Sequence, residues 1–216
     1  MATSARRLYG IYAVLPSDRD DLVLVQQAEA ALKGGIRILQ LRNKRQYGKA
    51  LLMLAQRIRH LTANYGATLI VNDALDLALA VGADGVHLGR SDIGDISQLR
   101  KLAGDRLLVG ASCQGDIDYG RSLLEHGVDQ LSFGAVYPTK SKAEARPIGL
   151  EHLVQMRKAL PEANIVAIGG ITLKSLPSIR QAGADSAAVI SDLFDHADIE
   201  GRAAELVECW GGRHAG

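Results

Sequence analysis

The feature that most constrains the fold is a regular alternation of short apolar runs with longer amphipathic stretches. Eight apolar runs are candidate strands: Leu8–Leu15, Ile36–Leu41, Thr68–Val71, Gly85–Leu88, Leu107–Gly110, Gln130–Phe133, Ile165–Ile168 and Ala187–Ile190. Helical patterns between them cover Leu22–Lys33, Lys49–Asn64, Asp116–His126, Leu150–Leu160 and Leu173–Gln181. This order predicts parallel strands that are joined by crossover helices.

Small-residue steps lead from several helical segments into the next apolar run. They are Lys33-Gly34-Gly35, Val81-Gly82-Ala83, His126-Gly127-Val128 and Ala182-Gly183-Ala184. A glycine just past a helix end accepts the left-handed conformation that closes the helix. The repeated units favour an α/β fold, a closed (β/α)8 TIM barrel. The alternative is a doubly wound open sheet, but it predicts a glycine-rich loop after the first strand, where this chain has Pro16-Ser17-Asp18.

Composition narrows the class of protein. No Pro-rich, Gly/Ser-rich or single-sign run divides the chain, so we expect one TIM-barrel domain over residues 1–216. A net charge of +1 and 4% aromatic residues disfavour a nucleic-acid partner. Two cysteines cannot make a disulfide framework, and no run approaches the roughly 18 apolar residues of a membrane span. We therefore expect a cytoplasmic protein with no membrane partner, and the pattern leaves a homo-oligomer open.

Polar residues recur where the strands are expected to end, which is where barrels of this class place their chemistry. Gln40 lies near the end of the second apolar run, and Arg42 and Lys44 follow it; the three share one side while the strand persists. Arginine binds a diphosphate bidentately and lysine binds it as a point charge. The segment therefore predicts a diphosphate site, with a pair of solvated surface cations as the alternative.

Two acids follow neighbouring apolar runs. Asn72 and Asp73 come directly after the third run, and Asp92 lies in the loop after the fourth. Two carboxylates, diphosphate oxygens and waters make a plausible Mg2+ shell. The alternative for Asp73 is a helix N-cap, since aspartate is favoured there. We interpret His87 as a packed or hydrogen-bonded strand residue and not as a metal ligand.

Later strand ends add hydroxyls, cations and glycines. Ser112 follows the fifth run and can donate a hydrogen bond to substrate, whereas its neighbour Cys113 is interpreted as a small packed residue. The longest irregular stretch, 137–147, alternates hydroxyls and cations as a phosphate-gripping lid requires; the alternative is an irregular surface loop.

The last two strand ends suggest a second anion site. Gly169-Gly170 follows the seventh run and Ser191 the eighth, where such barrels often bind phosphate; the alternative is a tight turn with an N-cap. These polar residues predict a diphosphate at one end of the site and a monophosphate at the other. They favour a reaction in which diphosphate departs with the help of a metal ion. The histidines outside the strands are interpreted as surface residues: His60, His126, His152, His196 and His214.

Several segments, taken together and in order, resemble the thiamine phosphate synthase family. They are Gln40-Leu41-Arg42-Asn43-Lys44, Asn72-Asp73, Ala83 through Gly89, Asp92, Gly134 through Thr139, Gly149-Leu150 and Ala167 through Ile171. The resemblance implies that Gln40, Arg42, Lys44 and Asn72 bind hydroxymethylpyrimidine diphosphate and that Asp73 and Asp92 hold Mg2+. It also implies that Ser112 and Lys142 contact the pyrimidine substrate or its diphosphate, and that the thiazole phosphate is held by Thr139, Ser141, Gly170, Ile190 and Ser191.

The implied reaction is dissociative: diphosphate leaves, a pyrimidine-methyl cation forms, and the thiazole nitrogen captures it. The implied catalytic residues are three cations, Arg42, Lys44 and Lys142, and the hydroxyl residue Ser112. The chain departs from the family pattern at Ala135, where a proline is usual, at Lys140, also usually a proline, and at Ser141, usually a threonine. A thiazole tautomerase of the same fold and a non-catalytic phosphate-binding barrel are the rival functions, and neither needs the paired acids.

Overall fold

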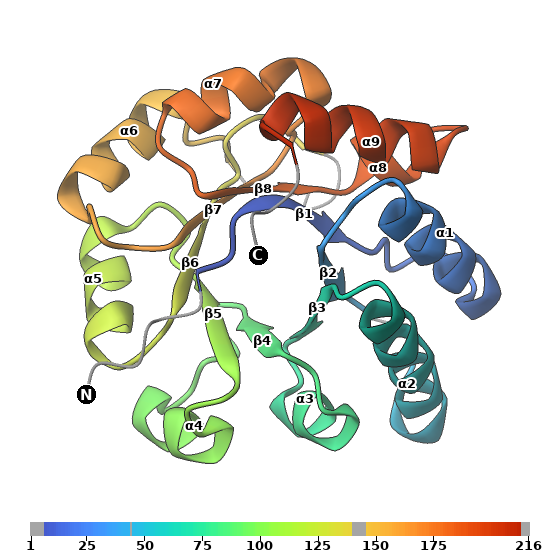
Figure 1. Ribbon diagram of the computed structural model, residues 1–216. Coiled ribbons are helices and arrows are strands. Elements are labelled where there is room, and N and C mark those ends of the chain that lie inside the picture. Colours follow the sequence, from blue (N-terminus) through green and yellow to red (C-terminus); the bar gives the residue numbers. More distant parts are fainter. Residues whose placement is uncertain (1–6, 44, 140–145, 213–216) are drawn as a thin grey trace.

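The computed structural model describes residues 7–43, 45–139 and 146–212, and it shows eight parallel strands closed into a barrel (Figure 1). The strands are β1 (Gly10–Val14), β2 (Ile38–Leu41), β3 (Thr68–Asn72), β4 (Gly85–Leu88), β5 (Leu108–Ser112), β6 (Gln130–Phe133), β7 (Ile165–Ile168) and β8 (Ser186–Val189). Each strand pairs with the next along the chain, and β1 pairs with β8. The (β/α)8 prediction is confirmed, and the open-sheet alternative is wrong.

Helices surround the barrel as an outer ring (Figure 1). They are α1 (Asp21–Lys33), α2 (Gly48–Asn64), α3 (Leu75–Val81), α4 (Ile96–Ala103), α5 (Ile117–Glu125), α6 (Leu150–Ala159), the 3-10 turn η1 (Leu173–Ser175), α7 (Leu176–Gln181), α8 (Ser191–Phe194) and α9 (Ile199–Trp210). The helix expected over Leu173–Gln181 therefore begins as η1 and continues as α7. Ile190, expected to end the last strand, lies just after β8.

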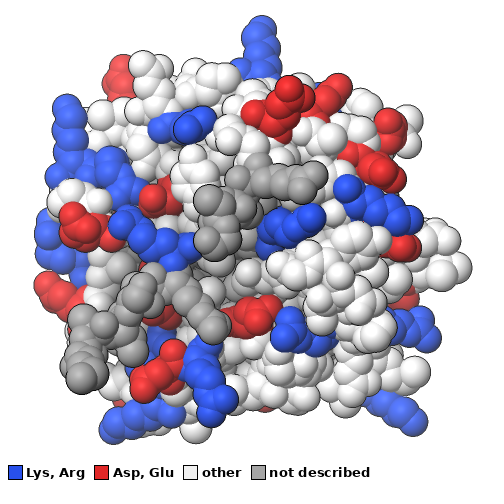
Figure 2. All heavy atoms as spheres, viewed as in Figure 1, with Lys and Arg blue, Asp and Glu red and all other residues white. Residues whose placement is uncertain are grey.

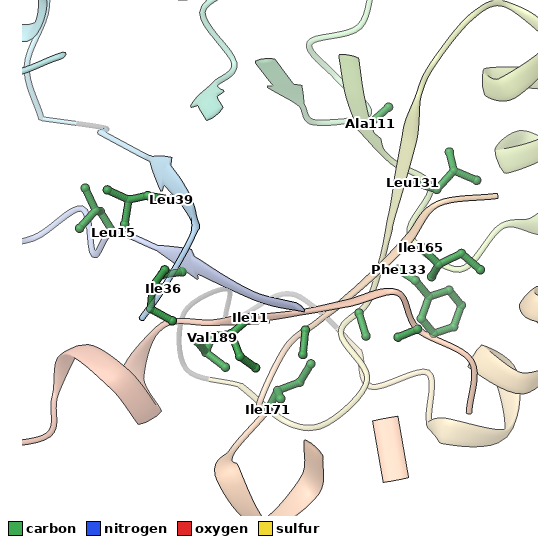
Figure 3. Close-up of a cluster of buried hydrophobic side chains, with 14 of the residues drawn as sticks. Ile11, Leu15, Ile36, Leu39, Ala111, Leu131, Phe133, Ile165, Ile171 and Val189 are labelled. Atoms are coloured by element: carbon green, nitrogen blue, oxygen red, sulfur yellow. The ribbon is translucent and has the colours of Figure 1, made fainter. Parts of the chain in front are cut away.

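Apolar side chains fill two separate layers. Leu15, Leu39 and Leu131 belong to the outer layer between strands and helices, which Figure 3 shows in part. The inner layer fills the barrel with Tyr12, Val14, Ile38, Ile70, Leu108, Val166 and Ala188. Because both faces of the sheet are covered, β1, β3 and β7 are near-continuous apolar runs, whereas β2, β4 and β6 carry polar side chains that face the cavity.

A repeated aspartate joins neighbouring units at the amino-terminal rim of the barrel. Asp84, Asp129 and Asp185 directly precede β4, β6 and β8 and follow the glycine steps. Their carboxylates accept the backbone N–H of Leu69, Val109 and Ile165, each at 2.8 Å. Each also pairs with an arginine of the helix two units back: Arg59, Arg100 and Arg157. The rim is thus fixed by charge-assisted hydrogen bonds to backbone groups near the starts of β3, β5 and β7.

Charges on the molecular surface are mixed. On the face seen in Figure 2, basic and acidic side chains are interspersed, so the described part of that face offers no broad basic surface of the kind that nucleic acids bind. No helix within the described residues has the length and hydropathy needed to cross a membrane.

The rim aspartates predict a measurable loss of stability. Asp84→Ala should lower the free energy of unfolding by about 1–3 kcal/mol, because it leaves the Leu69 N–H and the Arg59 guanidinium without their acceptor. Urea denaturation followed by circular dichroism measures this change. Asp105→Ala removes an exposed aspartate and should stay within about 0.5 kcal/mol of the wild-type protein. Equal stabilities of the two variants would contradict the role of the rim.

Candidate active site

A cavity of about 1450 Å3 opens at the carboxyl-terminal ends of the strands. Its walls come from the ends of all eight strands and from the segments that follow them. Ten of the thirteen predicted site residues line it: Gln40, Arg42, Asn72, Asp73, Asp92, Ser112, Thr139, Gly170, Ile190 and Ser191. The other three, Lys44, Ser141 and Lys142, lie outside the described residues. The structure therefore brings together every predicted site residue that it describes, and their roles stay predictions.

Asp73 and Asp92 border one small volume at the ends of β3 and β4. Asp73 has a left-handed backbone (φ 63°), and its carboxylate accepts the Gly89 N–H at 3.3 Å. The Asp92 backbone N–H donates to the Gly89 carbonyl at 2.9 Å. A Cβ on Gly89 would lie 2.5 Å from Asp92 Oδ2 and 3.9 Å from Asp73 Oδ1. The glycine thus leaves room between the two carboxylates.

The N-cap alternative for Asp73 is wrong. The N-cap of α3 is Ala74, and no side chain caps that helix. The Asp73 carboxylate instead accepts hydrogen bonds from the Asn72 side-chain amide and from Gly89, both at the cavity. An aspartate in a left-handed conformation at a strand end is strained, and such strain concentrates at functional sites.

The donor set at this pair fits a hard divalent cation. Carboxylate oxygens are the ligands that Mg2+ prefers, and Mg2+ is usually held by one or two carboxylates together with substrate phosphates and water. Within the described residues there is no group of three or more His, Cys, Asp or Glu side chains that could hold a metal. Two carboxylates alone would leave the remaining positions to substrate oxygens and water.

Two arginines lie at the same part of the cavity. Arg42 follows β2 and donates to Ser17 Oγ at 3.3 Å. Arg90, which the sequence patterns did not single out, donates to Asp116 at 3.3 Å, and its guanidinium lies 4.2 Å from the centre of the Tyr119 ring. The hydrogen bond from the Tyr119 N–H and the neighbouring Arg90 lower the pKa of Asp116. Both arginines can offer further N–H donors to an anion in the cavity.

Polar side chains form the floor of the cavity, inside the barrel. Gln40 donates to the Tyr12 hydroxyl at 2.9 Å, and burial raises the pKa of that phenol. His87 Nε2 lies 3.3 Å from Ser132 Oγ, and burial lowers the pKa of the imidazole to about 4. A Cβ on Gly110 would lie 2.9 Å from His87 Nδ1, so this glycine makes room for the ring. At neutral pH the floor is therefore polar but uncharged.

The loops after β6 and β7 interlock on the other side of the cavity. Val136 and Tyr137 donate backbone hydrogen bonds to the carbonyls of Ile168 and Gly169, at 2.9 and 3.0 Å. Gly170 has φ 63°, and a Cβ there would lie 2.4 Å from the Pro138 carbonyl oxygen. A larger residue would push these loops apart, so glycine is required by both conformation and space.

Comparison with known proteins agrees with this geometry. The family model described as thiamine monophosphate synthase matches residues 11–193. The chain is 42% identical over 207 residues to the thiamine-phosphate synthase of Chromobacterium violaceum, covering 96% of this chain and 99% of that one. It is 41% identical over 200 residues to the thiamine-phosphate synthase of Methylobacillus flagellatus, covering 92% and 94%. The chain belongs to the thiamine monophosphate synthase family.

Solved structures support the assignment at the level of the fold. The thiamine phosphate pyrophosphorylase from Pyrococcus furiosus superposes with a TM-score of 0.84 at 31% identity, over 94% of this chain and 95% of that one. A 3-hexulose-6-phosphate synthase superposes with a TM-score of 0.68 at 17% identity, over 92% and 99%, which shows a shared fold alone. The thiamine-phosphate synthases at 41–42% identity and the family model show that this chain is an enzyme of that type.

Some residues of this synthase were misjudged or missed from the sequence. His152 was expected at the surface, but it is half-buried, stacks on Phe133 at 5.7 Å between ring centres, and lies 2.7 Å from the Gly115 carbonyl. The floor residues Gln130 and Ser132 were not singled out. Their alternation within Gln-Leu-Ser-Phe was the available signal, because residues two apart share one face of a strand.

Two departures from the family pattern, Lys140 and Ser141, lie outside the described residues. Ala135 is described, and it is buried against the loop after β7, where a Cβ on Gly169 would come within 2.5 Å of its side chain. Cys113 is buried as expected, and its thiol donates to the Ser132 carbonyl at 3.3 Å.

The packing of Gly170 predicts a specific defect. Gly170→Ala should raise the KM at least tenfold for the substrate that binds against the loops after β6 and β7 and should lower the melting temperature, because the new methyl meets the Pro138 carbonyl. Gly66→Ala is the matched control: Gly66 has a similar φ of +59° but nothing within 4 Å of its Cβ position. The control should have a lower melting temperature and an unchanged KM. Steady-state kinetics with the precursors separates the variants, and equal KM values would contradict the prediction.

Proposed function

We propose that the protein joins 4-amino-2-methyl-5-hydroxymethylpyrimidine diphosphate to a thiazole phosphate with the help of Mg2+, giving thiamine phosphate and diphosphate. The observation that carries this proposal is one cavity with two chemically different ends. Paired carboxylates and Arg42 lie at β2–β4, and a glycine-lined cleft with the Ser191 hydroxyl lies at β7–β8. Family membership supports the same reaction.

At the first end, the pyrimidine diphosphate is bound by Gln40, Arg42, Lys44 and Asn72. Asp73 and Asp92 are the residues that would hold Mg2+, whose charge, when it is bound, offsets that of the leaving diphosphate. Ser112, at the end of β5, donates a hydrogen bond to the pyrimidine substrate, and Lys142 contacts its diphosphate. These assignments follow the resemblance, and the placement of the described residues in one cavity supports them.

At the second end, the thiazole phosphate is held by Thr139, Ser141, Gly170, Ile190 and Ser191. The tight contact between Gly170 and Pro138 fixes one wall of this cleft. Binding at both ends brings the thiazole nitrogen toward the pyrimidine methylene carbon, which is the positioning that a two-substrate reaction needs.

In the reaction, the bond between the methylene carbon and the diphosphate oxygen breaks, and its electron pair leaves with diphosphate. The lone pair of the thiazole nitrogen then forms the new bond to the pyrimidine-methyl cation. Arg42, Lys44 and Lys142 stabilise the negative charge that develops on the leaving group. The lowered pKa of His87 keeps the cavity floor from adding a positive charge near the cationic carbon.

The rivals are less well supported. A thiazole tautomerase of this fold would not need the paired acids, and neither would a non-catalytic phosphate-binding barrel. This chain has both acids, next to one glycine that leaves room between them. The curated relatives quoted above are themselves thiamine-phosphate synthases. We place the reaction in the cytoplasm, where the free thiols of Cys113 and Cys209 stay reduced.

Turnover is the direct test. Purified protein given both phosphorylated precursors and Mg2+ should form thiamine phosphate and release one diphosphate for each product molecule. A coupled assay of diphosphate release, with the product identified by mass spectrometry, measures both. Omission of the thiazole phosphate is the control. Diphosphate release no faster than in a reaction without protein would contradict the proposed activity.

The carboxylate pair predicts a metal-dependent defect. Asp92→Ala should lower turnover at least tenfold at low Mg2+, with partial recovery at high Mg2+, because one of two metal-binding carboxylates is lost. Asp95→Ala is the control from the same loop. Asp95 caps α4 by accepting the N–H groups of Ser97 and Gln98, so its loss should reduce stability and leave the Mg2+ dependence unchanged. If turnover of Asp92→Ala depended on Mg2+ as turnover of the wild-type protein does, Asp92 would not be a metal ligand.

A further inference from the structure

We propose that Arg202 and Asp192 form a positioning pair that holds the loops after β7 and β8 together and so sets the affinity for the thiazole phosphate. Asp192 is the second residue of α8 and lines the cavity directly after Ser191. Arg202 comes from α9, the helix that packs outside this part of the barrel. Neither residue is among the substrate contacts assigned above, and the inference rests on the proposed function.

Arg202 holds Asp192 through three hydrogen bonds. Its Nη2 donates to both carboxylate oxygens, at 2.8 and 2.9 Å, and its Nε donates to the Asp192 backbone carbonyl at 3.1 Å. The two side chains are only 16% and 15% exposed. Hydrogen bonding to Asp192 raises the pKa of Arg202, as expected for a tight charge-assisted pair. Both the backbone and the side chain of Asp192 are therefore fixed relative to α9.

The same carboxylate reaches the neighbouring loop. Asp192 Oδ2 accepts the backbone N–H of Leu173 at 3.0 Å. Leu173 begins η1, just after the segment that contains Gly170. Among the hydrogen bonds of the described residues, this is the side-chain bond that joins the loop after β7 to α8. The loop after β6 is already tied to the loop after β7 by backbone bonds, so Asp192 completes the chain of contacts around the cleft.

Charge explains why an arginine must accompany the aspartate. Asp192 lies at the cavity beside Ser191 and Ile190, where we place the phosphate. A carboxylate without a cation would repel a phosphate dianion in a partly buried site. Arg202 neutralises the carboxylate from the outer side while leaving Asp192 Oδ2 able to accept from Leu173. Arg202 also donates through Nη1 to Glu205 at 2.9 Å, but that carboxylate is 57% exposed and does not line the cavity. At the cleft itself, the Arg202–Asp192 pair aligns the loops with little net charge added.

The test separates positioning from simple stability. Arg202→Ala should raise the KM for the thiazole phosphate at least tenfold, and Asp192→Asn at least threefold, while the KM for the pyrimidine diphosphate stays within twofold of wild type. Arg202→Lys should restore part of the affinity, because lysine keeps the charge but not the two-oxygen contact. Calorimetric titration of each protein with the thiazole phosphate alone should show the same loss of affinity without turnover.

Arg157→Ala is the matched control, because it breaks a comparable pair with Asp185 at the opposite rim, where the side chains are 22% and 21% exposed. It should lower the melting temperature and leave both KM values within twofold of wild type. The inference is overturned if folded Arg202→Ala and Asp192→Asn bind the thiazole phosphate as tightly as wild type, or if both substrates weaken equally. A wild-type protein that binds thiazole phosphate but forms no thiamine phosphate would refute the proposed function alone, since the calorimetric comparison still decides the inference.

Discussion

The pairing of β1 with β8 closes the barrel and thereby decides where the ends of the strands meet. Because all eight strands are parallel and the sheet is closed, their carboxyl-terminal ends meet around one rim. Residues as distant in sequence as Gln40 and Ser191 consequently line one cavity. An open sheet would spread the same residues along an edge. The barrel instead sets the carboxylate end opposite the glycine-lined end, which is what a reaction between two anionic substrates requires.

The two rims of the barrel use similar side chains for different purposes. At the amino-terminal rim, aspartates such as Asp84 accept strand N–H groups and pair with helix arginines, which stabilises the closure. At the carboxyl-terminal rim, Asp73 and Asp92 border a volume that Gly89 keeps open. The Arg202–Asp192 pair combines features of both rims. It has the geometry of a structural ion pair, yet it lies at the cavity and fixes two of the loops that form it.

The fold and much of the cavity could be predicted from the sequence, because strand periodicity and the positions of polar residues after strands are local signals. Gln40 and Asp92 were found in this way, and both line the cavity. Contacts between distant segments left no such signal. The stacking of His152 on Phe133 and the bond from Leu173 to Asp192 join residues whose proximity depends on helix packing. Ile190 was assigned to the last strand because an apolar residue at a strand end looks the same on either side of the boundary.

We propose that Asp73 and Asp92 share one divalent ion with the diphosphate. Anomalous diffraction from crystals grown with Mn2+ and diphosphate tests it most directly, since Mn2+ replaces Mg2+ at oxygen sites and can be located by its own signal. We expect one strong peak within about 2.0–2.4 Å of a carboxylate oxygen from each aspartate and of a diphosphate oxygen. A peak that contacts neither aspartate, or diphosphate bound with the two carboxylates turned away from it, would show that these residues do not hold the metal.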